Sequence, residues 1–393
     1  MHATAGPRRW AVLVVGMLTL VATCAFQYGL PFLVPALRAS GLTLAEAGLL
    51  ISAPIAGVLS SLVVWGAVTD RVGELRVLVA GLAATIALLA VAATVDRTLV
   101  LGLLLAAAGA TSSCVHVASG RLILGWFAAH ERGLAMGLRQ TAQPLGVALA
   151  AVTLPGLGAR DPAAAIAFLA VASGVALLLV VAVVRDPAMP DAGDVAATAS
   201  PYRGDFLWRV HASSTLLVVP QFTVSAFAFD YLVNDRSWPS AAAGSVLAGA
   251  QVAGAGTRLA AGWWSDRARS RLRPMRALAL VTAVTLGGLA AGALTGTPVT
   301  VGLLLVAAAV TASTNGLAFT AVAERAGRYW AGRALGVQNT TQNVAAAATP
   351  PAVASLITAV GPASGYAAAF ALAVGFPLVA AMTIPVGGER PLA

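Results

Sequence analysis

Charged residues are scarce in this sequence, and many of them gather in two short segments of similar pattern. Only 10% of the residues are charged, yet "GAVTDRVGELR" (66–76) contains Asp70 and Arg71, and "AGWWSDRARSRLR" (261–273) contains Asp266 and Arg267. A carboxylate at the end of one helix can interact with the positive N-terminal end of a neighbouring helix, and an Arg beside it can form an ion pair. These residue types predict contacts between helices. The alternative is that each Asp is a solvated cap of its own helix.

A second group of residues is polar but lies inside long apolar runs. Such side chains are costly in hydrocarbon unless they pair with one another or line a wet cavity. Any single Gln or Asn could instead form a structural hydrogen bond between two helices. For the group as a whole we expect a lined substrate path. The predicted substrate-binding residues are Gln27, Tyr28, His116, Arg121, Gln143, Gln221, Gln251, Asn315, Gln342 and Asn343.

Within that group, Arg121 and His116 suggest what the substrate is. The two residues are five positions apart, which separates them by roughly 140° around a helix, so both do not face one cavity squarely. We expect Arg121 to pair with charge on the substrate and His116 to lie near mid-depth. No Asp or Glu lies deep in an apolar run, which favours an anionic or neutral solute over a cation. Proton coupling would fall to His116 or Asp230, and a structural hydrogen bond is the alternative for His116.

Other functional classes lack the residues that they need. All 24 basic residues are Arg, scattered singly, so no basic face for nucleic acid is expected. With no Lys, no Gly-rich phosphate loop followed by Lys exists, and no Cys or His pair stands at metal-ligand spacing. Cys24 and Cys114 lie in apolar runs and are expected to pack as small apolar residues. We expect neither an enzyme nor a cofactor.

The elements that must position these residues are membrane-spanning helices. Hydrophobic residues make up 59% of the chain, against roughly 45–50% in soluble globular proteins. The first run resembles a signal peptide but continues to about Leu37, so it is predicted to be the first span. At about 20 residues per span, twelve spans are predicted. They lie at residues 10–37, 46–68, 76–95, 98–127, 133–155, 162–184, 207–230, 240–263, 276–295, 298–322, 332–358 and 363–386.

The distribution of Arg predicts how these spans are oriented. Of the 24 basic residues, Arg121 and Arg258 fall within spans, and four others (Arg38, Arg97, Arg160 and Arg236) fall on one side. The remaining eighteen fall on the side of the N-terminus, which the positive-inside rule makes cytoplasmic. Both termini are therefore predicted to be cytoplasmic. The polar stretch 185–206 is predicted to be a cytoplasmic linker between an N-terminal half, 1–184, and a C-terminal half, 207–393.

The two predicted halves resemble one another. Asp70-Arg71 and Asp266-Arg267 occupy matching places after the second and eighth spans, and "AMGLRQTAQ" (135–143) aligns with "ALGVQNTTQ" (334–342). Six spans per half give both copies the same orientation, as a parallel repeat requires. A duplicated six-helix unit is typical of transporters.

With these motifs the chain resembles the major facilitator superfamily (MFS) over essentially its whole length. Gly66, Asp70, Arg71, Gly73 and Arg76 match the loop pattern of that superfamily, whereas Glu74 stands where a basic residue is usual. In the second copy Gly262, Asp266 and Arg267 match. Within the superfamily, the resemblance is closest to the cyanate- and nitrate-permease-like branch. It implies an all-α integral membrane protein with twelve transmembrane helices in two six-helix pseudo-repeats.

The repeat predicts a conformational latch on the cytoplasmic side. A two-fold arrangement would place Asp70 near Gly332 at the start of span eleven and Asp266 near Gly133 at the start of span five. Glu131 and Glu324 are candidate partners for Arg71 and Arg267. The predicted latch and gating residues are Gly66, Asp70, Arg71, Gly73, Arg76, Glu131, Arg132, Arg139, Arg258, Gly262, Asp266, Arg267, Glu324 and Arg325.

The sequence therefore predicts a secondary active transporter of the inner (cytoplasmic) membrane. We expect a monomer that moves a small organic anion or neutral metabolite by alternating access, coupled to protons or another ion. The expected partners are that small molecule and the lipid bilayer, with no nucleic acid. The alternative is an efflux permease for drug-like or metabolic compounds. Against this alternative, segment 99–110 has no charge, whereas proton-coupled drug antiporters carry an Arg motif early in span four.

Overall fold

The computed structural model describes residues 6–187, 199–361 and 364–389. Within these ranges all regular structure is helical, with no strand. Ten of the described segments are long and apolar enough to cross a membrane by length and composition. Helix α8 (Ala142–Gly158) has 17 residues and is not among them, and neither is α12 (Ser240–Arg267). Residues 188–198 of the predicted linker lie outside the described part of the chain.

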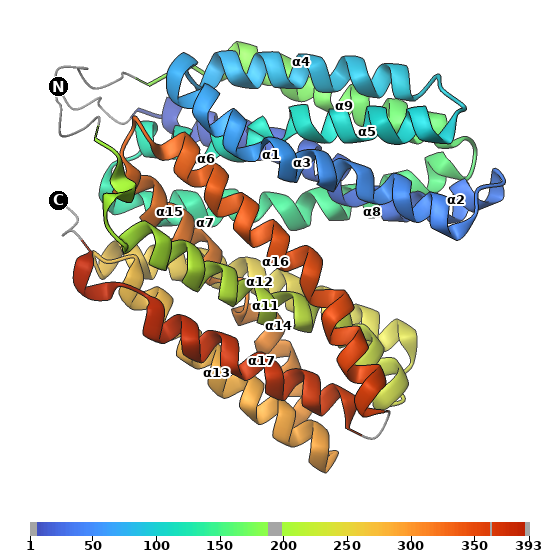
Figure 1. Ribbon diagram of the computed structural model, residues 1–393, viewed down its shortest axis with the longest axis vertical. Coiled ribbons are helices and arrows are strands. Elements are labelled where there is room, and N and C mark those ends of the chain that lie inside the picture. The colour runs from blue at the N-terminus through green and yellow to red at the C-terminus, as the bar shows by residue number, and fades with distance from the viewer. Residues whose placement is uncertain (1–5, 188–198, 362–363, 390–393) are drawn as a thin grey trace. The chain divides into compact units, whose positions relative to one another are not determined.

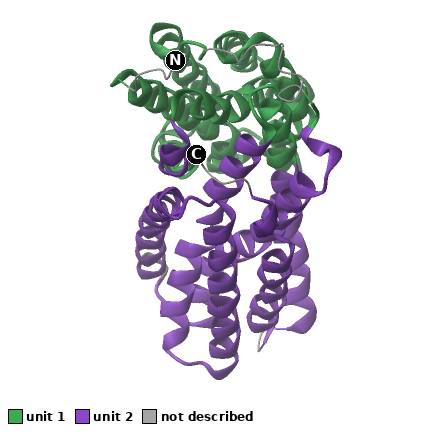
Figure 2. Cartoon of the chain, turned by 90° about the vertical axis from the view of Figure 1, so that its left-hand side faces the viewer, with its two compact units in different colours: residues 1–127, 138–200, 326–340 green, residues 128–137, 201–325, 341–393 purple. Residues whose placement is uncertain are grey.

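The chain forms two compact units (Figure 2). Unit 1 comprises residues 1–127, 138–200 and 326–340, and unit 2 comprises 128–137, 201–325 and 341–393. Each unit therefore contains most of one sequence half plus a short segment of the other half. The division of the chain at residues 184 and 207 stays a prediction.

Unit 1 is a bundle of long helices that run side by side (Figure 1). The closest pairs are α3 with α5, α1 with α8 and α4 with α9. Glycine explains the first pair, because a Cβ on Gly57 would lie 1.9 Å from Ala106 O and one on Gly109 would lie 2.1 Å from Pro54 O. The helices are α1 (Arg8–Gly29), α2 (Val34–Ala39), α3 (Leu44–Val72), α4 (Glu74–Ala92), α5 (Thr98–Ser112), α6 (Cys114–Trp126), α8 and α9 (Pro162–Val183).

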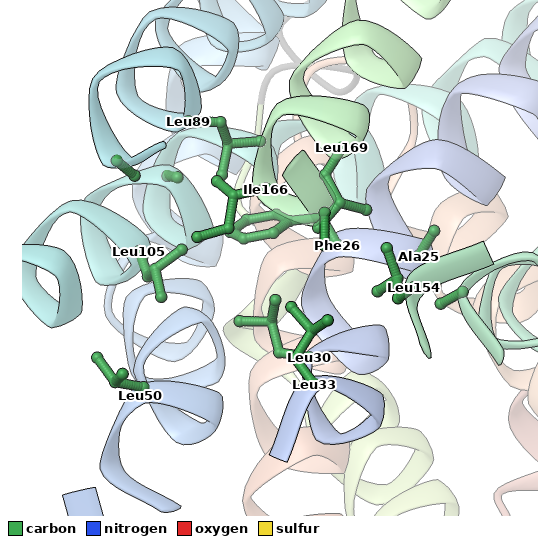
Figure 3. Packing of buried hydrophobic residues seen from close by; sticks show 14 of the residues in the cluster. Ala25, Phe26, Leu30, Leu33, Leu50, Leu89, Leu105, Leu154, Ile166 and Leu169 are labelled. Carbon is green, nitrogen blue, oxygen red and sulfur yellow. The ribbon is translucent and has the colours of Figure 1, made fainter. Parts of the chain in front are cut away.

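One end of unit 1 is held by an apolar core (Figure 3). Phe26 and Leu169 are completely buried there, and close van der Waals packing of such side chains holds membrane helices together. Large apolar side chains elsewhere, such as Val152 and Leu178, face outward, as lipid-facing residues do. The labelled core residues are Ala25, Phe26, Leu30, Leu33, Leu50, Leu89, Leu105, Leu154, Ile166 and Leu169.

Unit 2 repeats the pairing of unit 1. Helix α12 packs on α14 as α3 packs on α5, and α13 packs on α17 as α4 packs on α9. The helices are α11 (Phe206–Asp230), α12, α13 (Leu272–Thr295), α14 (Val299–Val310), α15 (Thr314–Ala326) and α17 (Gly365–Thr383). Two further helices, α7 (Arg132–Gln140) and α16 (Ala331–Val360), contribute residues to both units.

The Asp-Arg pairs of the two charged motifs lie inside helices, which continue beyond the predicted span ends at residues 68 and 263. Asp70 and Arg71 belong to the last turn of α3, and Asp266 and Arg267 to the last turn of α12. Gly73 ends α3 with φ = 92°, a conformation that favours glycine, and α4 begins at the next residue. Because the helices extend to the motif, each Asp is held on a rigid element.

Candidate functional site

Asp70 caps the start of α16 in unit 1. Its Oδ1 accepts a hydrogen bond from Gly332 N at 2.7 Å, and its Oδ2 accepts one from Arg333 N at 3.0 Å. The first turn of a helix has no intrahelical acceptor for these N–H groups, so a carboxylate there satisfies them and offsets the helix dipole. Close contact makes this possible, because a Cβ on Gly332 would lie 2.3 Å from Gly66 O.

Arg121 on α6 forms a buried ion-pair network with Asp70 inside unit 1. Its guanidinium is fully buried and pairs with Glu74 Oε1 at 3.1 Å and Asp70 Oδ1 at 3.5 Å. It also donates to Thr69 O at 3.0 Å and to Arg328 O at 2.8 Å. The donors of Arg121 are thus committed to protein acceptors. In this geometry Arg121 pairs with Asp70, a predicted latch residue, and its expected substrate-binding role stays a prediction.

Glu74 belongs to this ion-pair network, although the sequence did not indicate it as a site residue. Its side chain is 1% exposed and pairs with Arg328 Nη2 at 3.7 Å as well as with Arg121. The available signal was its departure from the basic residue usual at that position. An acidic side chain there supplies the charge that a buried Arg121 requires.

Asp266 repeats the capping arrangement in unit 2. It accepts hydrogen bonds from Gly133 N at 3.0 Å and Leu134 N at 2.8 Å, at the start of α7. A Cβ on Gly262 would lie 2.3 Å from Gly133 O, so α12 and α7 approach as closely as α3 and α16. The same residue types therefore cap two helices, each from the opposite sequence half to its Asp.

Arg271 is the buried cation of this second cap. It is 1% exposed, pairs with Asp266, and lies 3.1 Å from Glu324 Oε1. It also donates to Ser265 Oγ at 2.8 Å and to Ala129 O. Although burial disfavours the charged form, Glu324 and then Asp266 hold the pKa of Arg271 above its ordinary value. Sequence reasoning did not single out Arg271, because it has no counterpart at the matching position of the first copy.

The other predicted latch residues differ in their partners and in their exposure. Glu324 pairs with Arg271 and with Arg132, at 3.6 Å, instead of with the expected Arg267. The exposed Arg267 stacks on Trp263, one helical turn away, with its guanidinium carbon 4.2 Å from the ring centre. Arg71 and Arg76 are exposed, Glu131 is partly buried, and Arg325 lies over the ring of Phe206.

A polar cluster in unit 1 contains several of the predicted substrate residues. Gln27 donates to Ser112 Oγ at 2.8 Å, and its Oε1 lies 2.7 Å from His116 Nε2. Arg139, which the sequence grouped with the latch, is buried here and donates to His116 O at 2.6 Å and Ser119 Oγ at 3.0 Å. Of the two other residues predicted in this unit, Tyr28 is partly buried and Gln143 is exposed.

A second polar cluster lies in unit 2. Gln342 Nε2 is 3.4 Å from Ser214 Oγ and 3.5 Å from Asn315 Oδ1, and Asn315 Nδ2 donates to Gln221 Oε1 at 3.0 Å. Gln221 lines a cavity of about 220 Å³ together with Gln251 and Arg258. Asn343 is partly buried. Arg258 thus lies with predicted substrate residues and not with the latch.

Metal ligation finds no support in the described residues, where no group of three or more His, Cys, Asp or Glu could hold a metal ion. The chemistry available is therefore ion pairing, helix capping and hydrogen bonding by amides, a His and arginines.

The chain matches known transporters throughout its length. The model of the Major Facilitator Superfamily matches residues 15–350. The chain is 41% identical over 382 residues to the uncharacterized MFS-type transporter Rv2994 of Mycobacterium tuberculosis, covering 96% of this chain and 85% of that protein.

Solved structures share the fold. The E. coli fucose:proton symporter FucP superposes with a TM-score of 0.73 at 15% identity, over 94% of this chain and 97% of that one. The human organic anion transporter MFSD10 superposes with a TM-score of 0.70 at 20% identity, over 96% of this chain and 99% of that one. The all-α membrane fold predicted from the sequence is confirmed. These similarities do not test the resemblance to the cyanate- and nitrate-permease-like branch, which stays a prediction.

Proposed function

We propose, since the chain belongs to the Major Facilitator Superfamily, that it moves a small organic anion or neutral metabolite across the cytoplasmic membrane by alternating access. The chain is a multi-pass membrane transporter and not an enzyme. The proposal adds that it works as a single chain with both termini in the cytoplasm, and that transport is coupled to protons or another ion.

The observation that carries the proposal is the pair of carboxylate caps. Asp70 belongs to the first sequence half and binds the start of α16, which belongs to the second. Asp266 belongs to the second half and binds the start of α7, which belongs to the first. A movement that separates the start of α16 from α3, or the start of α7 from α12, must break these hydrogen bonds. The caps are therefore suited to hold one of two conformations.

The energy of each cap is suitable for a switch. A carboxylate at a helix start contributes roughly 0.3–2 kcal/mol through the dipole alone, and a hydrogen bond to a charged group adds roughly 1.5–3 kcal/mol. A conformational equilibrium separated by a few kcal/mol shifts when a ligand prefers one state by a similar amount. The caps thus favour closure on the cytoplasmic side without making it irreversible.

The two polar clusters support an anionic or neutral substrate. Their members are amides, hydroxyl groups, His116 and Arg139, and among the described hydrogen-bonded members there is no carboxylate. A cationic solute would have no counter-charge there. Asp230 accepts a hydrogen bond from Tyr366 in unit 2, and it is a candidate together with His116 for coupling to protons.

Uptake into proteoliposomes tests the proposal. Purified protein would be assayed with radiolabelled small organic acids and neutral metabolites, with and without an imposed pH gradient. We expect saturable uptake of at least one compound and loss of accumulation when a protonophore collapses the gradient. Protein-free liposomes are the control, and no flux of any compound would contradict the proposal. A deletion strain that gains sensitivity to a compound, instead of losing growth on one, would establish the efflux alternative.

A further inference from the structure

Arg258 is a partly buried cation that is not part of the predicted latch network. It lies on α12 and lines the cavity of about 220 Å³ inside unit 2. Its Nη1 atom is buried and has no hydrogen-bond partner among the residues that the structure describes. No described carboxylate forms an ion pair with it either, and no Asp or Glu lines the described cavity. Arg258 therefore has no counter-charge among the residues that the structure describes.

The arginines that are fully buried differ from Arg258, because the protein supplies hydrogen-bond or ion-pair partners for their guanidinium groups. Arg121 pairs with two carboxylates and Arg271 pairs with two more. Arg139 donates to His116 O and Ser119 Oγ. An unpaired charge in a low-dielectric interior is costly, and such charges in membrane helices mark binding or transport sites. Since the described part of the chain supplies no partner for Nη1 of Arg258, a ligand is the natural source of one.

The neighbouring amides also present donors to the cavity. Gln342 donates to Asn315, and Asn315 donates to Gln221 Oε1, so the acceptor of Gln221 is occupied. This leaves the Gln221 amide N–H groups to donate beside Arg258, which lines the same cavity. A chain of amides that ends in a donor next to a guanidinium is complementary to an anion and not to a cation.

We propose that this cavity binds the carboxylate of a small monocarboxylic acid, held by Arg258 and Gln221. A guanidinium binds a carboxylate through two parallel hydrogen bonds, which a Lys does not reproduce. The cavity is smaller than the roughly 300–1,000 Å³ typical of sites for drug-sized ligands, so it suits a compact acid. The inference rests on the proposed function, because it names the substrate class of that transporter.

Thermal unfolding of the purified full chain tests the site directly. Acetate, lactate and benzoate would be compared with acetamide, lactamide and benzamide at constant ionic strength. We expect at least one carboxylate to raise the Tm of the unaltered protein, while its matched amide does not. Arg258→Gln should weaken the apparent affinity by at least about 30-fold, as loss of a buried charge partner does, and Arg258→Lys should retain part of it. Arg273→Gln, which changes an exposed Arg, is the matched control.

The Tm without ligand separates binding from a structural role. If Arg258 is an unpaired cation, Arg258→Gln should raise the Tm of the unliganded protein, because it removes a desolvated charge. Three results would overturn the proposal: a lower Tm of unliganded Arg258→Gln, no rise in the Tm of the unaltered protein with any carboxylate, or an equal rise in the unaltered protein and in Arg258→Gln. Counterflow in proteoliposomes then separates the two claims. Binding that needs Arg258 without any flux would contradict the transport function alone, whereas flux unaffected by Arg258→Gln would contradict this site alone.

Discussion

Replacing Asp70 by Asn should release the start of α16 from α3. The substitution keeps the shape of the side chain and replaces one acceptor oxygen by an NH2 group. In the native protein Oδ1 and Oδ2 both accept from backbone N–H groups, of Gly332 and Arg333. In the variant only one oxygen can accept, and the NH2 group faces either a backbone donor or the guanidinium of Arg121, which lies 3.5 Å from Oδ1.

The magnitude follows from these contacts. Losing a hydrogen bond to a charged acceptor costs about 1.5–3 kcal/mol, and losing the interaction with the helix dipole costs up to about 2 kcal/mol. Part of this is offset, because a neutral amide is less costly to bury than a carboxylate. A net loss of about 2 kcal/mol corresponds to about 30-fold in the equilibrium between closed and released α16.

Labelling of a cysteine at residue 335 measures that equilibrium. Leu335 lies on α16, is completely buried, and its Cδ1 packs against Gly120 of α6. Leu335→Cys should react with a water-soluble maleimide only when α16 leaves this contact. The native Cys24 and Cys114 are both buried, so the parent chain gives a low background. Adding Asp70→Asn should raise the labelling rate about 30-fold if opening is rapid relative to labelling.

Asp205→Asn is the control, because the ion pair of Asp205 with Arg209 at 3.4 Å is exposed. It should leave the labelling rate unchanged, since exposed pairs contribute little. A rate in Asp70→Asn that equals the rate in this control would refute the latch. So would an increase of the same size in both variants, because it would indicate general loosening of the helices.

Three further changes test other parts of the arrangement. Gly133→Val should lower the Tm, because even its Cβ would lie 2.5 Å from a backbone oxygen and overpacking costs about 1–3 kcal/mol; Gly156→Val, at an open position, should not. Arg271→Met should cost about 3–5 kcal/mol of stability, because it leaves Asp266 without its buried cation and Glu324 with Arg132 alone; thermal unfolding measures this against the exposed Arg273→Met. Gln27→Leu should cost about 1–3 kcal/mol and slow transport, since it breaks the buried hydrogen bond to Ser112 and the partly buried one to His116; an unchanged Tm and transport rate would count against the cluster.

Much of the fold could be predicted from the sequence because the bilayer imposes strong local rules. A spanning helix must be about 20 apolar residues long, so each long apolar run predicts a helix without knowledge of its neighbours. The helix boundaries in the structure differ from the predicted span ends. The predicted span 98–127 is divided into α5 and α6 at Ser113, and α3 runs on through Asp70 to Val72. The length of an apolar run does not indicate whether the helix breaks within it, or whether the helix continues beyond it into polar residues.

The sequence by itself determined the residue types of the latch and their repetition, since a repeat is visible in the order of residues. It placed Asp70 beside Gly332, although 262 positions separate them, because two-fold symmetry of a duplicated unit relates their helices. Symmetry was a sufficient guide only where both copies keep the same residue.

Only the tertiary structure decided which cation serves which site. Arg121 was expected to meet substrate and Arg258 to serve the latch, whereas Arg121 pairs with Asp70 and Glu74 and Arg258 lines a cavity. Depth along a helix follows from the sequence, at about 1.5 Å per residue, but the neighbours of a side chain depend on helix rotation and packing. A long, flexible Arg side chain then takes whichever acceptors lie within its reach, and those come from helices distant in the sequence.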